Sequence, residues 1–76
     1  MTRVVWTESA LADLQAIQGF VSRDSARYAD LLVERILGAV GRIASFPRSG
    51  RVVPEFLDDS LREVIQGNYR IVYRLR

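Results

Sequence analysis

The sequence contains no cysteine and no histidine, and these two absences exclude much of the chemistry that small proteins perform. Without cysteine there are no disulfides, no thiolate nucleophile and no cysteine-bound metal. Without histidine there is no imidazole for acid–base steps, no Ser-His-Asp or Cys-His triad and no zinc finger. Chemistry is left to carboxylates, arginines, tyrosines and hydroxyls. Asp58-Asp59 alone is too little for a divalent cation, so we expect no metal and no organic cofactor.

Lysine is absent as well, because all 11 basic residues are arginine, and the formal net charge is +2. Arginine is the better side chain for bidentate contacts with phosphate or carboxylate, although a coding bias explains the same observation. Residues 1–47 carry five Arg and five Asp or Glu, whereas residues 60–76 carry four Arg and one Glu. The basic character therefore belongs to the C-terminal segment.

Long apolar runs are also missing. No segment approaches the roughly 20 apolar residues that cross a bilayer, and the N-terminus lacks the basic-then-apolar pattern of a secretory signal, so we expect a cytoplasmic protein without a membrane partner. A content of 49% apolar and 26% charged residues is typical of a globular domain. A chain of this size buries only roughly 60% of its unfolded surface, which predicts marginal stability and a partner that completes it.

The most informative stretch is LREVIQGNYRIVYRLR, residues 61–76. Gly67-Asn68 separates two runs rich in Val, Ile and Tyr, and Gly-Asn is a two-residue hairpin signal in which glycine takes a positive φ. The sequence therefore predicts two antiparallel strands. The expected cross-strand pairs are Gln66 with Tyr69, Val64 with Ile71 and Arg62 with Tyr73.

This register gives the hairpin two different faces. The tyrosine face carries the six paired residues and Leu75. The arginine face carries Leu61, Glu63, Ile65, Arg70, Val72, Arg74 and Arg76. On it Glu63 would stand opposite Val72, with Arg70 and Arg74 as diagonal neighbours that neutralise it. A three-residue loop would instead move Glu63 to the tyrosine face.

The residues before the hairpin predict one strand and two helices. Arg3–Trp6 is β-branched and aromatic, which favours a strand with Trp6 in the core. Thr7 is the expected N-cap of a helix over residues 8–21, and Ser22–Ser25 interrupts the pattern and caps a second helix. The apolar stripes expected to face the core are Ala10, Leu14, Ile17 and Val21, then Ala29, Val33, Ile36, Val40 and Ile43.

The two predicted helices form an αα-hairpin, because Leu31, Leu32 and Leu37 broaden the apolar surface of the second helix. Gly38 and Gly41 suggest a close helix contact there. The remaining stretch, residues 46–60, is predicted to be a loop with Gly50 in a turn. Together these elements predict an α+β fold: an N-terminal strand, a helical hairpin and an antiparallel β-hairpin, with one face of the small sheet covered by the helices.

The helix with ALADLQAI, the loop FPRSGRVVPE and the hairpin LREVIQGNYRIVYR together resemble the RelE/ParE superfamily of type II toxin–antitoxin toxins. The run from Tyr69 to Tyr73 is the most characteristic, with Pro47, Gly50-Arg51 and Pro54-Glu55 in support. The resemblance implies one toxin domain over residues 1–76 that inhibits growth, as in plasmid stabilisation, and a small acidic antitoxin bound in a hetero-oligomer. Relatives usually continue into another strand and a tail, which this chain is expected to lack.

The superfamily divides between toxins that poison DNA gyrase and toxins that cut messenger RNA on the ribosome. In the ribonuclease reading, Arg70 binds phosphate, Glu55 acts as base and Tyr73 or Arg62 assists. Leu61 and Glu63 stand where that branch often has lysines, and no C-terminal acid is present, so the constellation is incomplete. The resemblance therefore favours a ParE-like gyrase poison without catalytic residues.

Other interpretations stay open. The chain could be an inactive remnant that binds only its antitoxin, or a direct nucleic-acid binder, although four strand arginines without exposed aromatics are a weak footprint. The residues expected to contact the target or the antitoxin are Arg48, Arg51, Arg62, Arg70, Arg74 and Arg76. Several of the candidate residues also have an ordinary structural explanation: Tyr73 could pack in the core, Arg70 could neutralise Glu63, and Glu55 could pair with an arginine.

Overall fold

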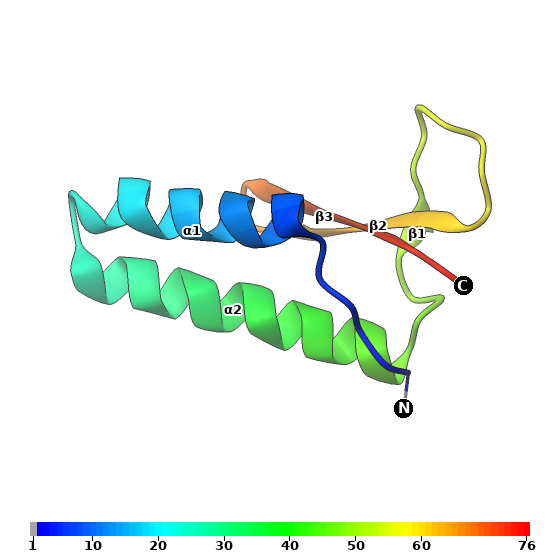
Figure 1. Cartoon of the computed structure of the whole chain (residues 1–76), viewed down its shortest axis with the longest axis horizontal. Helices are drawn as coiled ribbons and strands as arrows, with labels where there is room; N and C mark the ends of the chain where they lie inside the picture. The colour runs from blue at the N-terminus through cyan, green and yellow to red at the C-terminus, as the bar shows by residue number, and fades with distance from the viewer. Residues whose placement is uncertain (1) are drawn as a thin grey trace.

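The computed structural model describes residues 2–76 and contains two helices followed by a three-stranded antiparallel sheet. The elements are α1 (Glu8–Ser22), α2 (Ala26–Ser45), β1 (Arg51–Val52), β2 (Leu61–Gln66) and β3 (Tyr69–Arg74). The helices lie side by side as an αα-hairpin, with the sheet at one end of the pair (Figure 1). The predicted α+β fold is confirmed. Neither helix is long and apolar enough to cross a membrane.

Both helices begin at the predicted caps. The Thr7 hydroxyl accepts a hydrogen bond from the Ala10 N–H at 3.0 Å, and the Ser25 hydroxyl accepts one from the Tyr28 N–H at 3.1 Å. The predicted stripe of α1 is its half-buried side. The buried residues of α2 are Ala29, Leu32, Ile36, Ala39, Ile43 and Ala44, with Val33 and Val40 half-buried beside them. Leu31 and Leu37 are exposed, so the buried side of α2 is narrower than predicted.

The close helix contact predicted at Gly38 and Gly41 is wrong. A Cβ atom built on Gly41 would meet nothing within 4 Å, and one on Gly38 would meet only the Arg42 side chain, at 3.8 Å. Both glycines are exposed residues of α2, and neither has an atom of α1 within 4 Å of its Cβ position.

We therefore expect Gly41→Ala to raise the free energy of unfolding by about 1 kcal/mol, because alanine removes the helix-propensity penalty of glycine without a steric cost. Urea denaturation would report a higher midpoint with an unchanged slope. The control is Gly67→Ala, which is expected to destabilise because Gly67 has a φ of 61°. A lower midpoint for Gly41→Ala would contradict the open space at this position.

The strand predicted at Arg3–Trp6 is wrong. This segment forms no ladder with any described strand, and the backbone hydrogen bond beside it runs from the Thr2 N–H to the Ala44 oxygen of α2, at 2.8 Å. It passes from α1 toward the C-terminal end of α2 (Figure 1). Trp6 is 37% exposed and lines a groove of about 270 Å³ between α1, α2 and β3 instead of entering the core. β-propensity alone made no strand, because a strand also needs a neighbouring edge to pair with.

The loop predicted over residues 46–60 contains a short strand, so that prediction was wrong in part. Arg51 and Val52 pair with Glu63 and Arg62 of β2. The next residue, Val53, is buried and donates its N–H to the Leu61 oxygen at 3.1 Å. Burial of Val53 holds this segment against β2, which makes β2 the central strand and leaves β3 at the edge.

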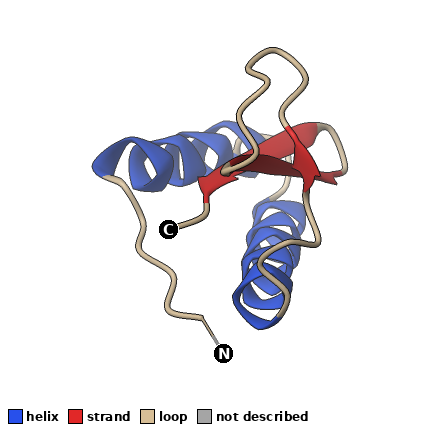
Figure 2. Ribbon diagram, turned by 90° about the vertical axis from the view of Figure 1, so that its right-hand side faces the viewer, coloured by secondary structure: helices blue, strands red, loops and turns tan. Residues whose placement is uncertain are grey.

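The predicted hairpin register is confirmed in every pair, from Gln66 with Tyr69 to Arg62 with Tyr73. Gly67 has the positive φ that the two-residue turn requires, and Asn68 does not. The three-residue alternative is therefore excluded. α2 packs against the sheet, and the loop between β1 and β2 rises from the sheet on the side away from α2 (Figure 2).

Candidate functional site

Glu63 lies at the centre of the arginine face and is the buried charged residue of the described chain, with a side chain that is 0% exposed. Its Oε2 accepts a hydrogen bond from Arg51 Nε at 2.6 Å, and its Oε1 accepts one from Arg70 Nη1 at 3.1 Å. The arginine side chains remain 66% and 44% exposed. Neutralisation by Arg70 was predicted, whereas the partner Arg51 was missed because β1 was missed.

Arg70 also joins the sheet to the loop between β1 and β2. Its Nη1 donates to Glu55 Oε2 at 2.7 Å. This hydrogen bond from Arg70 holds the pKa of Glu55 below its ordinary value and, reciprocally, raises the pKa of Arg70. A carboxylate with a lowered pKa is a weaker base, so the pairing works against a role of Glu55 in proton abstraction.

This pairing predicts a pH dependence. The folded-state pKa of Glu55 is lowered, so its stabilising contribution is present above the ordinary value of 4.5 and is lost as the pH falls below it. We expect the Tm of the wild type to exceed that of Glu55→Gln at pH 6, and the difference to shrink in acid. In an Arg70→Gln background the same difference should be much smaller at pH 6, because the hydrogen bond from Arg70 is the main cause of the lowered pKa. A difference that is constant with pH would contradict the ion pair.

Asp58 is a second carboxylate of the loop that is bound by an arginine of β3. Arg74 Nη1 donates to Asp58 Oδ2 at 3.2 Å and to the Ser60 hydroxyl at 3.0 Å. Asp58 Oδ1 accepts hydrogen bonds from the hydroxyl and the N–H of Ser60, at 2.7 and 3.0 Å. The Ser60 hydroxyl is the main cause that lowers the pKa of Asp58. Arg74 was predicted to neutralise Glu63, but it reaches the loop instead.

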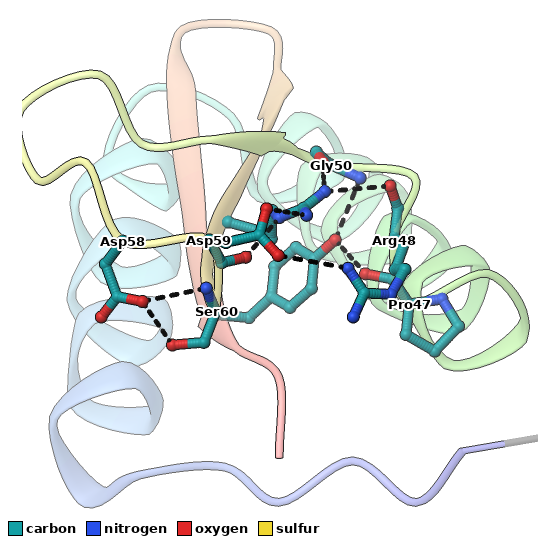
Figure 3. A network of polar contacts seen from close by, with 8 residues as sticks. Pro47, Arg48, Gly50, Asp58, Asp59 and Ser60 are labelled. Atoms are coloured by element: carbon teal, nitrogen blue, oxygen red, sulfur yellow. Dashed lines mark hydrogen bonds and ion pairs between the residues drawn. The ribbon is translucent and has the colours of Figure 1, made fainter.

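Arg62 connects the segment before β1 to the loop between β1 and β2. Its Nε and Nη2 donate to the backbone oxygen and the carboxylate of Asp59, both at 2.8 Å. Its Nη1 donates to the oxygens of Gly50 and Arg48, at 3.1 and 3.4 Å. The side chain is only 11% exposed. Arg48 reaches the other carboxylate oxygen of Asp59 at 3.4 Å, so this network joins residues 48–50 to residues 58–60 (Figure 3).

The Tyr73 hydroxyl forms the second link between the sheet and the residues before β1. It donates to the Pro47 oxygen at 2.6 Å and accepts from the Gly50 N–H at 3.0 Å. Gly50 was predicted to serve a turn, but its φ is not positive. Glycine is required at this position because the Tyr73 side chain packs directly against the backbone: a Cβ atom there would lie 2.6 Å from the Tyr73 hydroxyl.

The structure thus brings together some of the predicted site residues and separates others. Glu55 and Arg70 are in contact, whereas Tyr73 lies on the opposite face of the hairpin. Arg62 is engaged in the interior of the loop network. The exposed arginines at this end of the molecule are Arg48, Arg51, Arg70, Arg74 and Arg76. Among residues 2–76, no group of three or more acidic side chains is placed to hold a metal ion.

Comparison with known proteins gives two matches. The model of the family described as "ParE toxin of type II toxin-antitoxin system, parDE" matches residues 4–76. The chain is also similar to Toxin RelE2 of Caulobacter vibrioides, with 35% identity over 65 residues that cover 86% of this chain and 69% of that protein. The family match spans both helices and all three described strands, and therefore every residue of the arginine face.

Proposed function

Because this chain belongs to the ParE toxin family of type II toxin–antitoxin systems, we propose that it inhibits growth by binding DNA gyrase and stabilising its cleaved-DNA state. As a toxin of the RelE/ParE superfamily, it has an antitoxin as its partner. The proposal assigns the arginine face and the adjoining loop to protein recognition, with no catalytic step performed by the chain itself.

The observation that carries this proposal is that the candidate acid–base groups are already hydrogen-bonded within the protein. Cleavage of RNA needs a base for the 2′-hydroxyl, a cation for the phosphorane and a proton donor for the leaving oxygen. Glu55 is paired with Arg70, which lowers its pKa. The Tyr73 hydroxyl already donates its proton to the Pro47 oxygen. These groups do not converge on one reacting atom, whereas a protein-binding surface needs no such convergence.

A ribosome-dependent endoribonuclease is the second candidate. It is supported by the similarity to a protein named Toxin RelE2 and by the position of Arg70. The guanidinium of Arg70 is partly exposed and binds a carboxylate at 2.7 Å. A phosphate could replace that carboxylate, because arginine pairs with both groups in similar geometry.

The test uses two assays on the purified protein. Incubation with DNA gyrase and relaxed plasmid is expected to block supercoiling and to accumulate cleaved DNA. Translating ribosomes programmed with a defined messenger RNA are expected to leave the RNA intact. RNA cuts at fixed codon positions, with normal gyrase activity, would replace the proposal by the endoribonuclease. Inactivity in both assays would leave a remnant that binds only its antitoxin.

A further inference from the structure

Two guanidinium groups of the arginine face are held on either side of one buried carboxylate. Arg51 of β1 is the direct cross-strand neighbour of Glu63 on β2, and Arg70 of β3 is its diagonal neighbour on the other side. Arg51 binds one oxygen of Glu63 at 2.6 Å, and Arg70 binds the other at 3.1 Å. Each strand thus contributes one residue, and the two cations are ordered before any partner arrives, which lowers the entropy cost of binding.

Most of the N–H donors of this arginine pair have no protein acceptor within residues 2–76. A guanidinium carries five N–H groups. Arg51 donates only through Nε, and Arg70 donates only through Nη1. Because the two side chains remain 66% and 44% exposed, an acceptor from another molecule can reach them.

The two carboxylates that contact the arginine pair differ in how firmly they are held. Glu63 is fully buried and is bound by both arginines. Glu55 is 51% exposed on the loop between β1 and β2, and within the described chain Arg70 is the arginine that binds it, at 2.7 Å. Exposed ion pairs contribute little net free energy, because water hydrates both charges when they separate. Glu55 can therefore leave Arg70 at low cost and be replaced by another carboxylate.

The charge balance of this half of the molecule favours an anionic partner. Residues 1–45 carry equal numbers of arginines and carboxylates, whereas residues 46–76 carry six arginines and four Asp or Glu, so the whole net charge of +2 lies there. The surplus persists when every carboxylate of residues 46–76 is paired with an arginine. A positive surplus on one part of a surface attracts negatively charged partners.

We propose that Arg51 and Arg70 form a binding site for a carboxylate of an acidic peptide segment in a protein partner, with Glu55 as the internal occupant that the partner displaces. The occupant identifies the ligand class, because Glu55 binds Arg70 as a carboxylate side chain. The incoming carboxylate takes over this bond and gains the unused donors of Arg51. The inference goes beyond the proposed function, since it holds for any partner with such a segment and does not need gyrase as the target.

The test uses fluorescein-labelled hexaglutamate as the acidic peptide and measures fluorescence anisotropy at low ionic strength, where charge interactions are least screened. Glu55→Gln is expected to bind about three- to fivefold more tightly than the wild type, because the internal competitor is removed. The matched control is Glu34→Gln, the same charge change at an exposed residue of α2 that forms no ion pair within the described chain. It is expected to bind like the wild type.

Substitution of the arginines should have the opposite effect. Arg70→Gln and Arg51→Gln are each expected to weaken hexaglutamate binding about fivefold or more, because each removes charge-assisted donors. Circular dichroism at the temperature of the assay checks that the variants are folded. If an arginine variant is unfolded, the comparison of Glu55→Gln with Glu34→Gln decides alone.

Three results would overturn the proposal. Equal tightening by Glu55→Gln and Glu34→Gln would mean that only net charge matters. Failure of Glu55→Gln to bind hexaglutamate would mean that the pair is no carboxylate site. Labelled hexauridylate is expected to bind more weakly than the peptide, and tighter binding that is lost in Arg70→Gln would assign the site to phosphate instead. None of these measurements contains gyrase, so this proposal and the proposed function fail separately.

Discussion

Alanine in place of Gly50 is expected to lower the free energy of unfolding by about 3 kcal/mol. The new Cβ would lie 2.6 Å from the Tyr73 hydroxyl and 2.7 Å from the Glu63 carbonyl oxygen. Overpacking of this kind costs about 1–3 kcal/mol, and each lost hydrogen bond adds about 1 kcal/mol. For a domain of this size the expected fall in Tm is roughly 15 °C, measurable by circular dichroism.

The clash is expected to be costly because neither neighbour can retreat cheaply. The Glu63 carbonyl belongs to the central strand. The Tyr73 ring can move only by giving up its hydrogen bonds to Pro47 and Gly50, at 2.6 and 3.0 Å. The matched control is Gly41→Ala, the same chemical change where a Cβ meets nothing within 4 Å, and it should change stability in the opposite direction. A Tm for Gly50→Ala close to that of the wild type would mean that β1 can separate from β2 without loss.

The features that could be predicted from the sequence depend on residues close together in the chain. Thr7 and Ser25 cap helices through bonds to residues three positions away. The hairpin register follows from Gly67-Asn68 and from the alternation on each side of it, since a two-residue turn fixes which residues face each other. Nothing outside the segment needs to be known for either prediction.

The features that were missed depend on contacts between distant residues. The Arg51–Glu63 bond spans 12 positions, and the Gly50–Tyr73 bond spans 23. The sequence of residues 51–52 gives too short a run to indicate a strand, and only the burial of Val53 against β2 produces one. Conversely, Arg3–Trp6 has the composition of a strand but makes no ladder, because composition does not supply a pairing partner.

The candidate site was predicted in its residue types but not in their arrangement. Arg70 and Glu55 were named, and the structure places them in contact at 2.7 Å. Arg62 was grouped with the partner-binding arginines, yet its donors are directed to Asp59 and to the backbone of residues 48 and 50. Which arginines stay exposed depends on where the loop folds back, and residues 53–60 carry no local pattern that determines this.

The second large effect is expected when Arg51 and Arg70 are both replaced by alanine. Each donates to a different oxygen of Glu63, at 2.6 and 3.1 Å, and the Glu63 side chain is fully buried. Either single variant leaves one charged donor in place, and the remaining arginine is exposed enough to stay hydrated. We expect each single substitution to cost about 1 kcal/mol, which is less than the usual range of about 1.5–3 kcal/mol for a hydrogen bond to a charged group, because both arginines are partly exposed to water.

The double variant differs in kind, because it leaves a buried carboxylate with neither of its ion-pair partners. An uncompensated buried charge destabilises by about 3–5 kcal/mol, which exceeds the sum of the single effects. A double-mutant cycle by urea denaturation is therefore expected to show a coupling of at least about 1 kcal/mol between Arg51 and Arg70. The coupling should disappear in a Glu63→Gln background, because the amide carries no charge to neutralise. Additive single effects, or a coupling that persists in Glu63→Gln, would mean that the two arginines stabilise the sheet independently of the buried carboxylate.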